Sequence, residues 1–158
     1  MLNAMRFVLL LSLAVWVGAL IFFTFFAAPS IFKVLPRELA GEVVGDMFPK
    51  YWMIGYVAGL LSLSSLLGIS FIEKGFPAAR VILLTVMTGV TFYSGLVVAP
   101  KAHEMRIEAR AAKETGEKEA PSIEKAFKRT HAISAALNMA VIVFGVIVIY
   151  LMSRSLRL

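Results

Sequence analysis

Hydrophobic residues fall into four long runs that contain no charged side chain. These runs cover residues 7–32, 51–72, 81–100 and 132–153. Each run has 20 residues or more, and about 20 helical residues cross a hydrocarbon core of roughly 30 Å. A soluble bundle of such helices would need outer helices to cover it, and the sequence has none left for that purpose. The pattern therefore predicts an all-α integral membrane four-helix bundle, one domain over residues 1–158, with spans at about residues 7–30, 51–72, 80–100 and 128–153.

The first connecting segment, residues 33–50, has its own polar and apolar pattern. Pro36 suits the first position of a helix, and Leu39, Val43 and Met47 then repeat every four residues beside an acidic face. This amphipathic pattern predicts a short interfacial helix that lies on the membrane surface. We expect Pro49 to end it before the second span begins.

The pattern changes again after Pro100. Residues 101–113 are strongly charged, yet they favour a helix, and their charges recur three and four residues apart. We therefore predict that the third span continues as a helical extension beyond the membrane, until Gly116 breaks it. The fourth helix then runs through His131 to Ser153.

Three hydrogen-bonding side chains open the fourth span. His131, Ser134 and Asn138 occupy positions i, i+3 and i+7, which places them on one face of a helix, just after Arg129. Polar groups in hydrocarbon are costly without partners, so this face should turn inward. The neighbours that we expect for it are small, polar or aromatic residues of the other spans, namely Trp16, Gly18, Thr85, Thr88 and Phe92.

The composition of the chain limits the partners it can bind and the reactions it can catalyse. The chain is 59% hydrophobic and 16% charged, with a net charge of +6 and a mean hydropathy of +0.84. Its basic residues sit at span ends or among acidic neighbours, which does not indicate a nucleic-acid partner. Cysteine is absent, which excludes disulfides, thiolate ligands and cysteine nucleophiles. No Gly-x-Ser-x-Gly element is present either, so the sequence favours a non-enzymatic role.

Four spans place both termini on one side of the bilayer. Arg6, Lys74, Arg80, Arg154 and Arg157 all lie next to spans on that side, whereas the other side has 11 basic and 9 acidic residues. Counting basic residues alone would make the long-loop side cytoplasmic. Net charge indicates the reverse, and we expect the termini to be cytoplasmic because the basic residues of the loops are largely neutralised.

Several short motifs, in order along the chain, resemble the transmembrane protein 205-like family, domain of unknown function 4149. They are Trp16-x-Gly18 with the Phe-rich end of span one, Pro29, Leu35-Pro36 to Gly41, Phe48-Pro49-x-Tyr51, Pro100 with Arg106, and Phe127-x-x-x-His131-x-x-Ser134-x-x-x-Asn138. The resemblance implies a small four-span helical membrane protein and assigns no reaction to it. More distantly, the architecture is similar to copper-resistance D-type proteins and to four-helix protoporphyrinogen-oxidising membrane proteins, which imply metal or haem by analogy alone.

Three functional hypotheses follow. In the first, a pocket at the long-loop interface binds or transports a small amphipathic or anionic ligand, such as a lipid headgroup. Its candidate residues are His131, Ser134, Asn138, Arg129, Arg106, Trp16 and Tyr51. In the second, the chain is an accessory or assembly subunit that docks a membrane partner, or another copy of itself, through this face and Gly55-x-x-x-Gly59. In the third, His131 binds haem or copper together with Met139 or His103.

Overall fold

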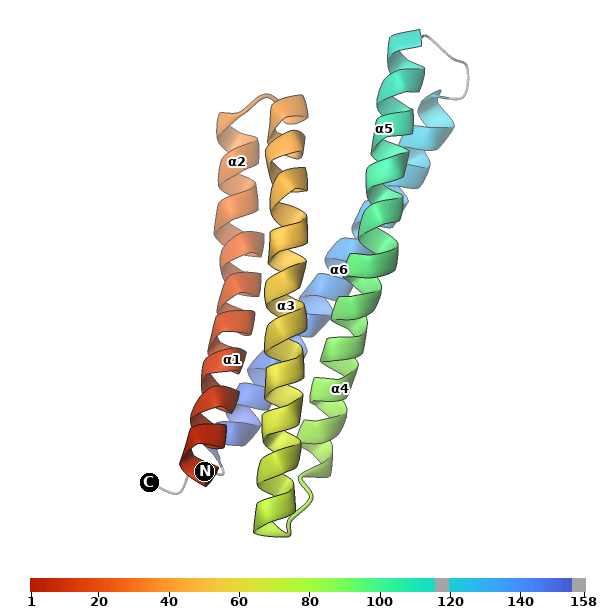
Figure 1. The fold of residues 1–158 in the computed structure, drawn as a ribbon. Helices are drawn as coiled ribbons and strands as arrows, with labels where there is room; N and C mark the ends of the chain where they lie inside the picture. Colours follow the sequence, from red (N-terminus) through yellow and green to blue (C-terminus); the bar gives the residue numbers. More distant parts are fainter. Residues whose placement is uncertain (116–119, 155–158) are drawn as a thin grey trace.

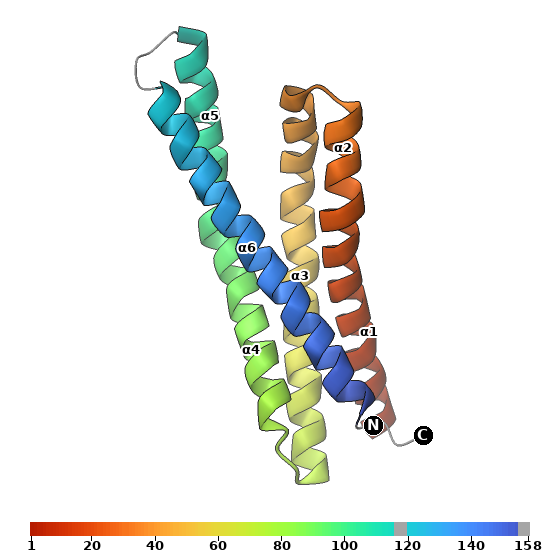
Figure 2. The ribbon, with the colours of Figure 1, turned by 180° about the vertical axis from the view of Figure 1, so that it is seen from behind.

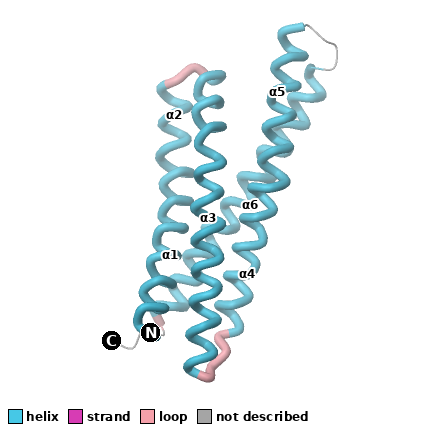
Figure 3. The backbone as a smooth tube through the Cα atoms, viewed as in Figure 1, coloured by secondary structure: helices cyan, strands magenta, loops and turns pink. Residues whose placement is uncertain are grey.

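The structure is a computed structural model that describes residues 1–115 and 120–154, and this part of the chain is helical almost throughout (Figures 1 and 3). Its elements are α1 (Leu2–Phe22), η1 (Phe23–Ala27), α2 (Ala28–Val34), α3 (Arg37–Glu73), α4 (Ala78–Tyr93), η2 (Ser94–Val98), α5 (Ala99–Thr115) and α6 (Ala120–Ser153). Four helical stretches are long and apolar enough to cross a membrane, namely Leu2–Val34, Arg37–Glu73, Ala78–Ala112 and Ser122–Ser153. The predicted all-α membrane fold is confirmed, and the chain is a multi-pass membrane protein.

The four long helices form two hairpins. The first pairs α1, η1 and α2 with α3, and the second pairs α4, η2 and α5 with α6 (Figure 1). Helix α6 runs obliquely, from α5 at the long-loop end to α1 at the other end (Figure 2). The N-terminus and the end of α6 therefore lie at the same end of the bundle.

Pro29 and Pro100 do not end their helices. Each follows a five-residue π-helical turn and one alanine, so η1 precedes Ala28-Pro29 and η2 precedes Ala99-Pro100. A proline lacks the N–H that a regular turn needs, and its ring meets the carbonyl four residues earlier. A π turn shifts the backbone hydrogen-bond register by one residue. The helix can therefore accommodate the proline and continue beyond it.

The predicted short interfacial helix was wrong. Residues 37–50 are the first turns of α3, which continues through Pro49 for 37 residues, or about 55 Å. Contacts with α5 hold this extension upright, because the Arg106 guanidinium donates to the carbonyl oxygens of Gly41 and, at 3.2 Å, Glu38. The ion pair between Arg110 and Glu42, at 2.8 Å, adds to them.

The predicted extension after the third span is confirmed, since α5 continues to Thr115. The predicted break at Gly116 lies outside the described residues, as does Arg157.

The core of the bundle is closed around Trp16, whose side chain is 1% exposed. The indole faces Gly55 and Gly59 of α3. A Cβ atom built on Gly55 would lie 2.8 Å from Thr91 Cγ2 and 3.2 Å from Trp16 Nε1. Gly55-x-x-x-Gly59 therefore serves close packing inside this chain, of the kind that small residues permit between membrane helices.

Candidate functional site

A pocket of about 300 Å³ lies between the two hairpins, on the long-loop side of the core. It is partly open and is walled by the end of the first helical stretch, by α3 and by α6. Its lining consists of Phe23, Thr24, Ala28, Pro29, Phe32, Val44, Phe48, Tyr51, Trp52, His131, Ser134, Ala135 and Asn138.

A hydrogen-bonded trio joins three helices at this pocket. The Tyr51 hydroxyl on α3 donates to Asn138 Oδ1 on α6. Asn138 Nδ2 in turn donates to Thr24 Oγ1 at 2.8 Å. Thr24 belongs to η1, so the π turn sets the position of this acceptor. Such bonds between membrane helices each contribute about 0.6 kcal/mol on average, and here they fix the polar part of the pocket.

His131 and Ser134 extend the polar side of the pocket along α6. Together with Asn138 they line the same pocket, as side chains on one helix face can. The His131 ring packs against Phe127, with 6.1 Å between ring centroids, and remains exposed, whereas Ser134 is half-buried. The face therefore becomes less buried from Asn138 toward the long-loop end.

Aromatic rings make up the other walls. Phe23 packs against Tyr51 at 4.8 Å between centroids, and Phe48 stacks on Trp52 at 6.3 Å. Offset and tilted ring pairs of this kind are stabilising, so the walls hold each other in place. Sequence reasoning missed Thr24, Phe23 and Trp52 as lining residues. The available signal was a single polar residue, Thr24, inside the Phe-rich end of the first span.

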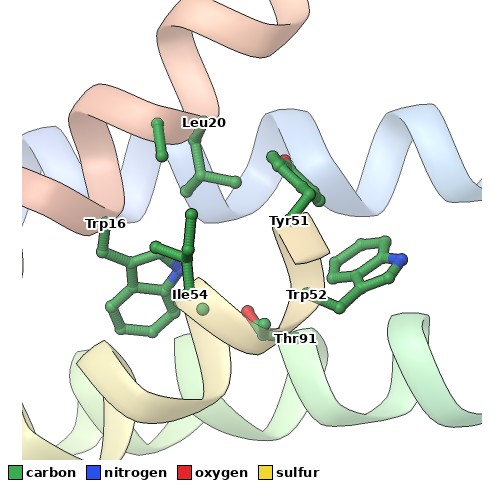
Figure 4. A pocket seen from close by; sticks show the side chains of 8 residues that line it. Trp16, Leu20, Tyr51, Trp52, Ile54 and Thr91 are labelled. Atoms are coloured by element: carbon green, nitrogen blue, oxygen red, sulfur yellow. The ribbon is translucent and has the colours of Figure 1, made fainter. Parts of the chain in front are cut away.

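Trp16 lies deeper than predicted. It lines a second, much smaller cavity below the pocket, too narrow to hold a water molecule, together with Tyr51, Trp52 and Thr91 (Figure 4). Asn138 takes its hydrogen-bond partners, Thr24 and Tyr51, from outside the expected set of Trp16, Gly18, Thr85, Thr88 and Phe92. The physical reason is packing: the side chains of Trp16 and Thr88 lie directly against Gly59 in the core. Tyr51 and Trp52 line both cavities and separate them.

Neither predicted arginine lines the pocket. Arg129 is exposed on α6, and the guanidinium of Arg106 lies on the carbonyl oxygens of α3. The expected basic rim is therefore not part of the lining. Arg106 instead braces the extension of α3 that carries Val44 and Phe48.

The donor set of the pocket does not fit haem or copper. Among the lining residues His131 is the single imidazole, and no thioether accompanies it. In the described part of the chain, no three His, Asp or Glu side chains gather as a metal site.

Comparison with known proteins identifies the family of this chain. Residues 11–111 match the family described as "Domain of unknown function (DUF4149)". The chain is also 29% identical over 151 residues to a protein of Aquifex aeolicus (strain VF5) described as "Uncharacterized protein", with 92% of this chain and 94% of the relative covered. No solved structure matches the chain significantly. Because the family match spans well over half of its length, the chain belongs to the family of domain of unknown function 4149.

Proposed function

We propose that this protein binds a small amphipathic molecule in the pocket between its hairpins, as a membrane binding or transport protein. One observation supports this proposal above the others. Three polar side chains of α6, His131, Ser134 and Asn138, line one pocket together with Tyr51. A concave apolar site with a few convergent polar groups is the usual form of a small-molecule site.

The depth of the pocket suits an amphipathic molecule. Lys50, Lys101 and Arg129 are the first charged residues beyond the second, third and fourth spans on the long-loop side, so they mark the edge of the hydrocarbon core. On α3, Lys50 marks this edge, and the lining residues from Val44 to Trp52 lie on both sides of it. A bound molecule would therefore have its polar end at the interface and its apolar part among the aromatic rings.

The packing below the pocket favours binding over free passage. Trp16, Leu13 and Met87 are almost completely buried there, and Tyr51 and Trp52 separate the two cavities. Movement of a molecule to the opposite leaflet would require the hairpins to separate around Trp16. The hypothesis that the chain docks a membrane partner used two surfaces, the polar face of α6 and Gly55-x-x-x-Gly59. The second surface is not available to a partner, since the chain itself covers Gly55 and Gly59.

We also propose that both termini are cytoplasmic, with the pocket toward the outer face of the membrane. In support, Arg6, Lys74, Arg80 and Arg154 all adjoin the spans at the terminal end.

The orientation can be tested with single cysteines, because the chain has none of its own. We expect Glu108→Cys, on the exposed surface of α5, to react with a membrane-impermeant maleimide in intact cells. Phe76→Cys, in the turn between α3 and α4, should react only after lysis. The opposite labelling pattern would refute the proposed orientation, and labelling of both in intact cells would refute the arrangement of the spans.

The binding proposal predicts a specific effect of Asn138→Leu. This change keeps the number and branching of the side-chain heavy atoms but removes both bonds of the trio and leaves the Tyr51 hydroxyl without its acceptor. We expect a loss of about 1–2 kcal/mol in unfolding free energy, a folded bundle, and loss of the molecule retained through purification. Thermal unfolding in detergent and native mass spectrometry measure the two effects.

Met139→Leu is the matched control, because Met139 is the next residue on α6, is 40% exposed and does not line the pocket. It should retain the molecule at the parent level. A parent protein that carries nothing, or an Asn138→Leu variant with unchanged ligand content, would contradict the proposed function.

A further inference from the structure

We infer that the ligand is an uncharged lipid whose head group accepts hydrogen bonds, and that it enters sideways from the long-loop leaflet, between α2 and α6. This inference rests on the proposed function and assigns a chemical class to the same pocket. Three observations support it: the absence of charged side chains from the lining, the N–H groups of the lining that are available as donors, and the exposed residues at the α2 and α6 edges of the pocket.

The lining carries no fixed charge. Lysine, arginine, aspartate and glutamate are all absent from it, and His131 is exposed at its edge. A charged group brought into such a site would lose water without gaining a counter-charge, which is strongly unfavourable. The pocket therefore discriminates against an anionic head.

Three basic residues near the pocket are engaged within the protein. Arg106 donates to α3 carbonyl oxygens, while Lys50 pairs with Asp46 at 2.6 Å and Lys128 with Glu124 at 2.7 Å. Arg129 is exposed on α6 and does not line the pocket. These positive charges therefore do not belong to the lining, where an anionic head group would need them.

Two side chains of the pocket lining carry N–H groups that could donate to a ligand. Asn138 Oδ1 already accepts from Tyr51, whereas its amide group has a second hydrogen beyond the one given to Thr24. The Trp52 indole N–H has no partner among the described residues, although the side chain is only 6% exposed. Figure 4 shows its nitrogen on the side of the ring away from Trp16. A ligand that offers acceptor oxygens would satisfy these groups.

The edges of the pocket on α2 and α6 carry exposed side chains. Helix α6 moves away from α1 and α2 as it rises toward the long-loop end (Figure 2), and the pocket lies between these elements. Phe32 is 48% exposed at the α2 edge, and Ala135 is exposed at the α6 edge. A lipid in that leaflet reaches the pocket without crossing water, which suits a molecule of low solubility.

Matched lipids test this assignment. Dioctanoylglycerol and dioctanoyl phosphatidic acid share their tails and differ in head charge, and a short-tailed benzoquinone offers acceptor oxygens on a different scaffold. Each probe is titrated into the detergent-purified protein, and its affinity follows from the rise in unfolding temperature. We expect at least one neutral probe to bind tenfold or more tightly than the phosphatidic acid. The stronger neutral probe shows whether glycerides or quinones are the source.

Two variants separate donor chemistry from charge. Trp52→Phe keeps an aromatic ring but loses the N–H, and it should weaken the better neutral probe about tenfold. The smaller ring fills less of this buried site and should lower unliganded stability, so binding is measured as the shift from each variant's own unliganded unfolding temperature. Arg129→Gln, outside the lining, should change no affinity.

Tighter binding of phosphatidic acid, weakened by Arg129→Gln, would overturn the inference and leave the proposed function standing. An unchanged neutral affinity in Trp52→Phe, or no shift with any probe, would also overturn it. The proposed function has a separate test. It would be contradicted only if, in addition, the purified protein carried no bound molecule that is lost in Asn138→Leu.

Discussion

Gly55→Leu is expected to lower the free energy of unfolding by about 3 kcal/mol, or to prevent accumulation of the folded protein. The first atom of a new side chain would lie 2.8 Å from Thr91 Cγ2 and 3.2 Å from the Trp16 indole nitrogen. Trp16 is 1% exposed and Thr91 is 2% exposed, so neither can move into open space. Overpacking of a filled core typically costs 1–3 kcal/mol, and a leucine adds three further carbons to that first clash.

Gly89→Leu is the matched control for this change. Gly89 lies within α4, where a Cβ atom would meet nothing within 4 Å. Both variants remove a helical glycine and add the same side chain, so their difference isolates packing from helix propensity. Thermal unfolding in detergent should show a large loss for Gly55→Leu and almost none for Gly89→Leu. Equal stabilities would show that α1, α3 and α4 do not meet as described.

The spans could be predicted from the sequence because each hydrophobic run must itself satisfy the length of the bilayer. The extension of α3 could not. Pro49 is a strong local signal for a break, and the contacts that override it join Gly41 and Glu42 to Arg106 and Arg110, 65 and 68 residues further along the chain. Local patterns carry no information about such a pairing.

Local sequence patterns were equally uninformative about distant contacts at the candidate site. His131, Ser134 and Asn138 were predictable as one face because their spacing follows the helical period and polar groups are costly in hydrocarbon. Their partners were not, since Asn138 meets Thr24 and Tyr51, 114 and 87 residues away in sequence. Trp16 is predicted from the sequence as a neighbour of this polar face, but Gly55 and Gly59 leave room for its indole in the core instead.

Ala135→Phe is expected to abolish ligand retention while preserving the fold. Ala135 lines the pocket on α6 and is exposed, so a phenylalanine there can extend into a space of about 300 Å³ without displacing the core. The added ring occupies the volume that the apolar part of a ligand needs. Because the hydrogen-bonded trio is untouched, unfolding free energy should change by less than about 1 kcal/mol.

Ala136→Phe provides the control within the same helix turn, because Ala136 is also exposed but does not line the pocket. The most direct measurement is native mass spectrometry of the parent and both variants, purified in the same mild detergent from the same cells. We expect one retained molecule in the parent and in Ala136→Phe, and none in Ala135→Phe. Equal retention in Ala135→Phe and Ala136→Phe would contradict the assignment of the pocket as the binding site.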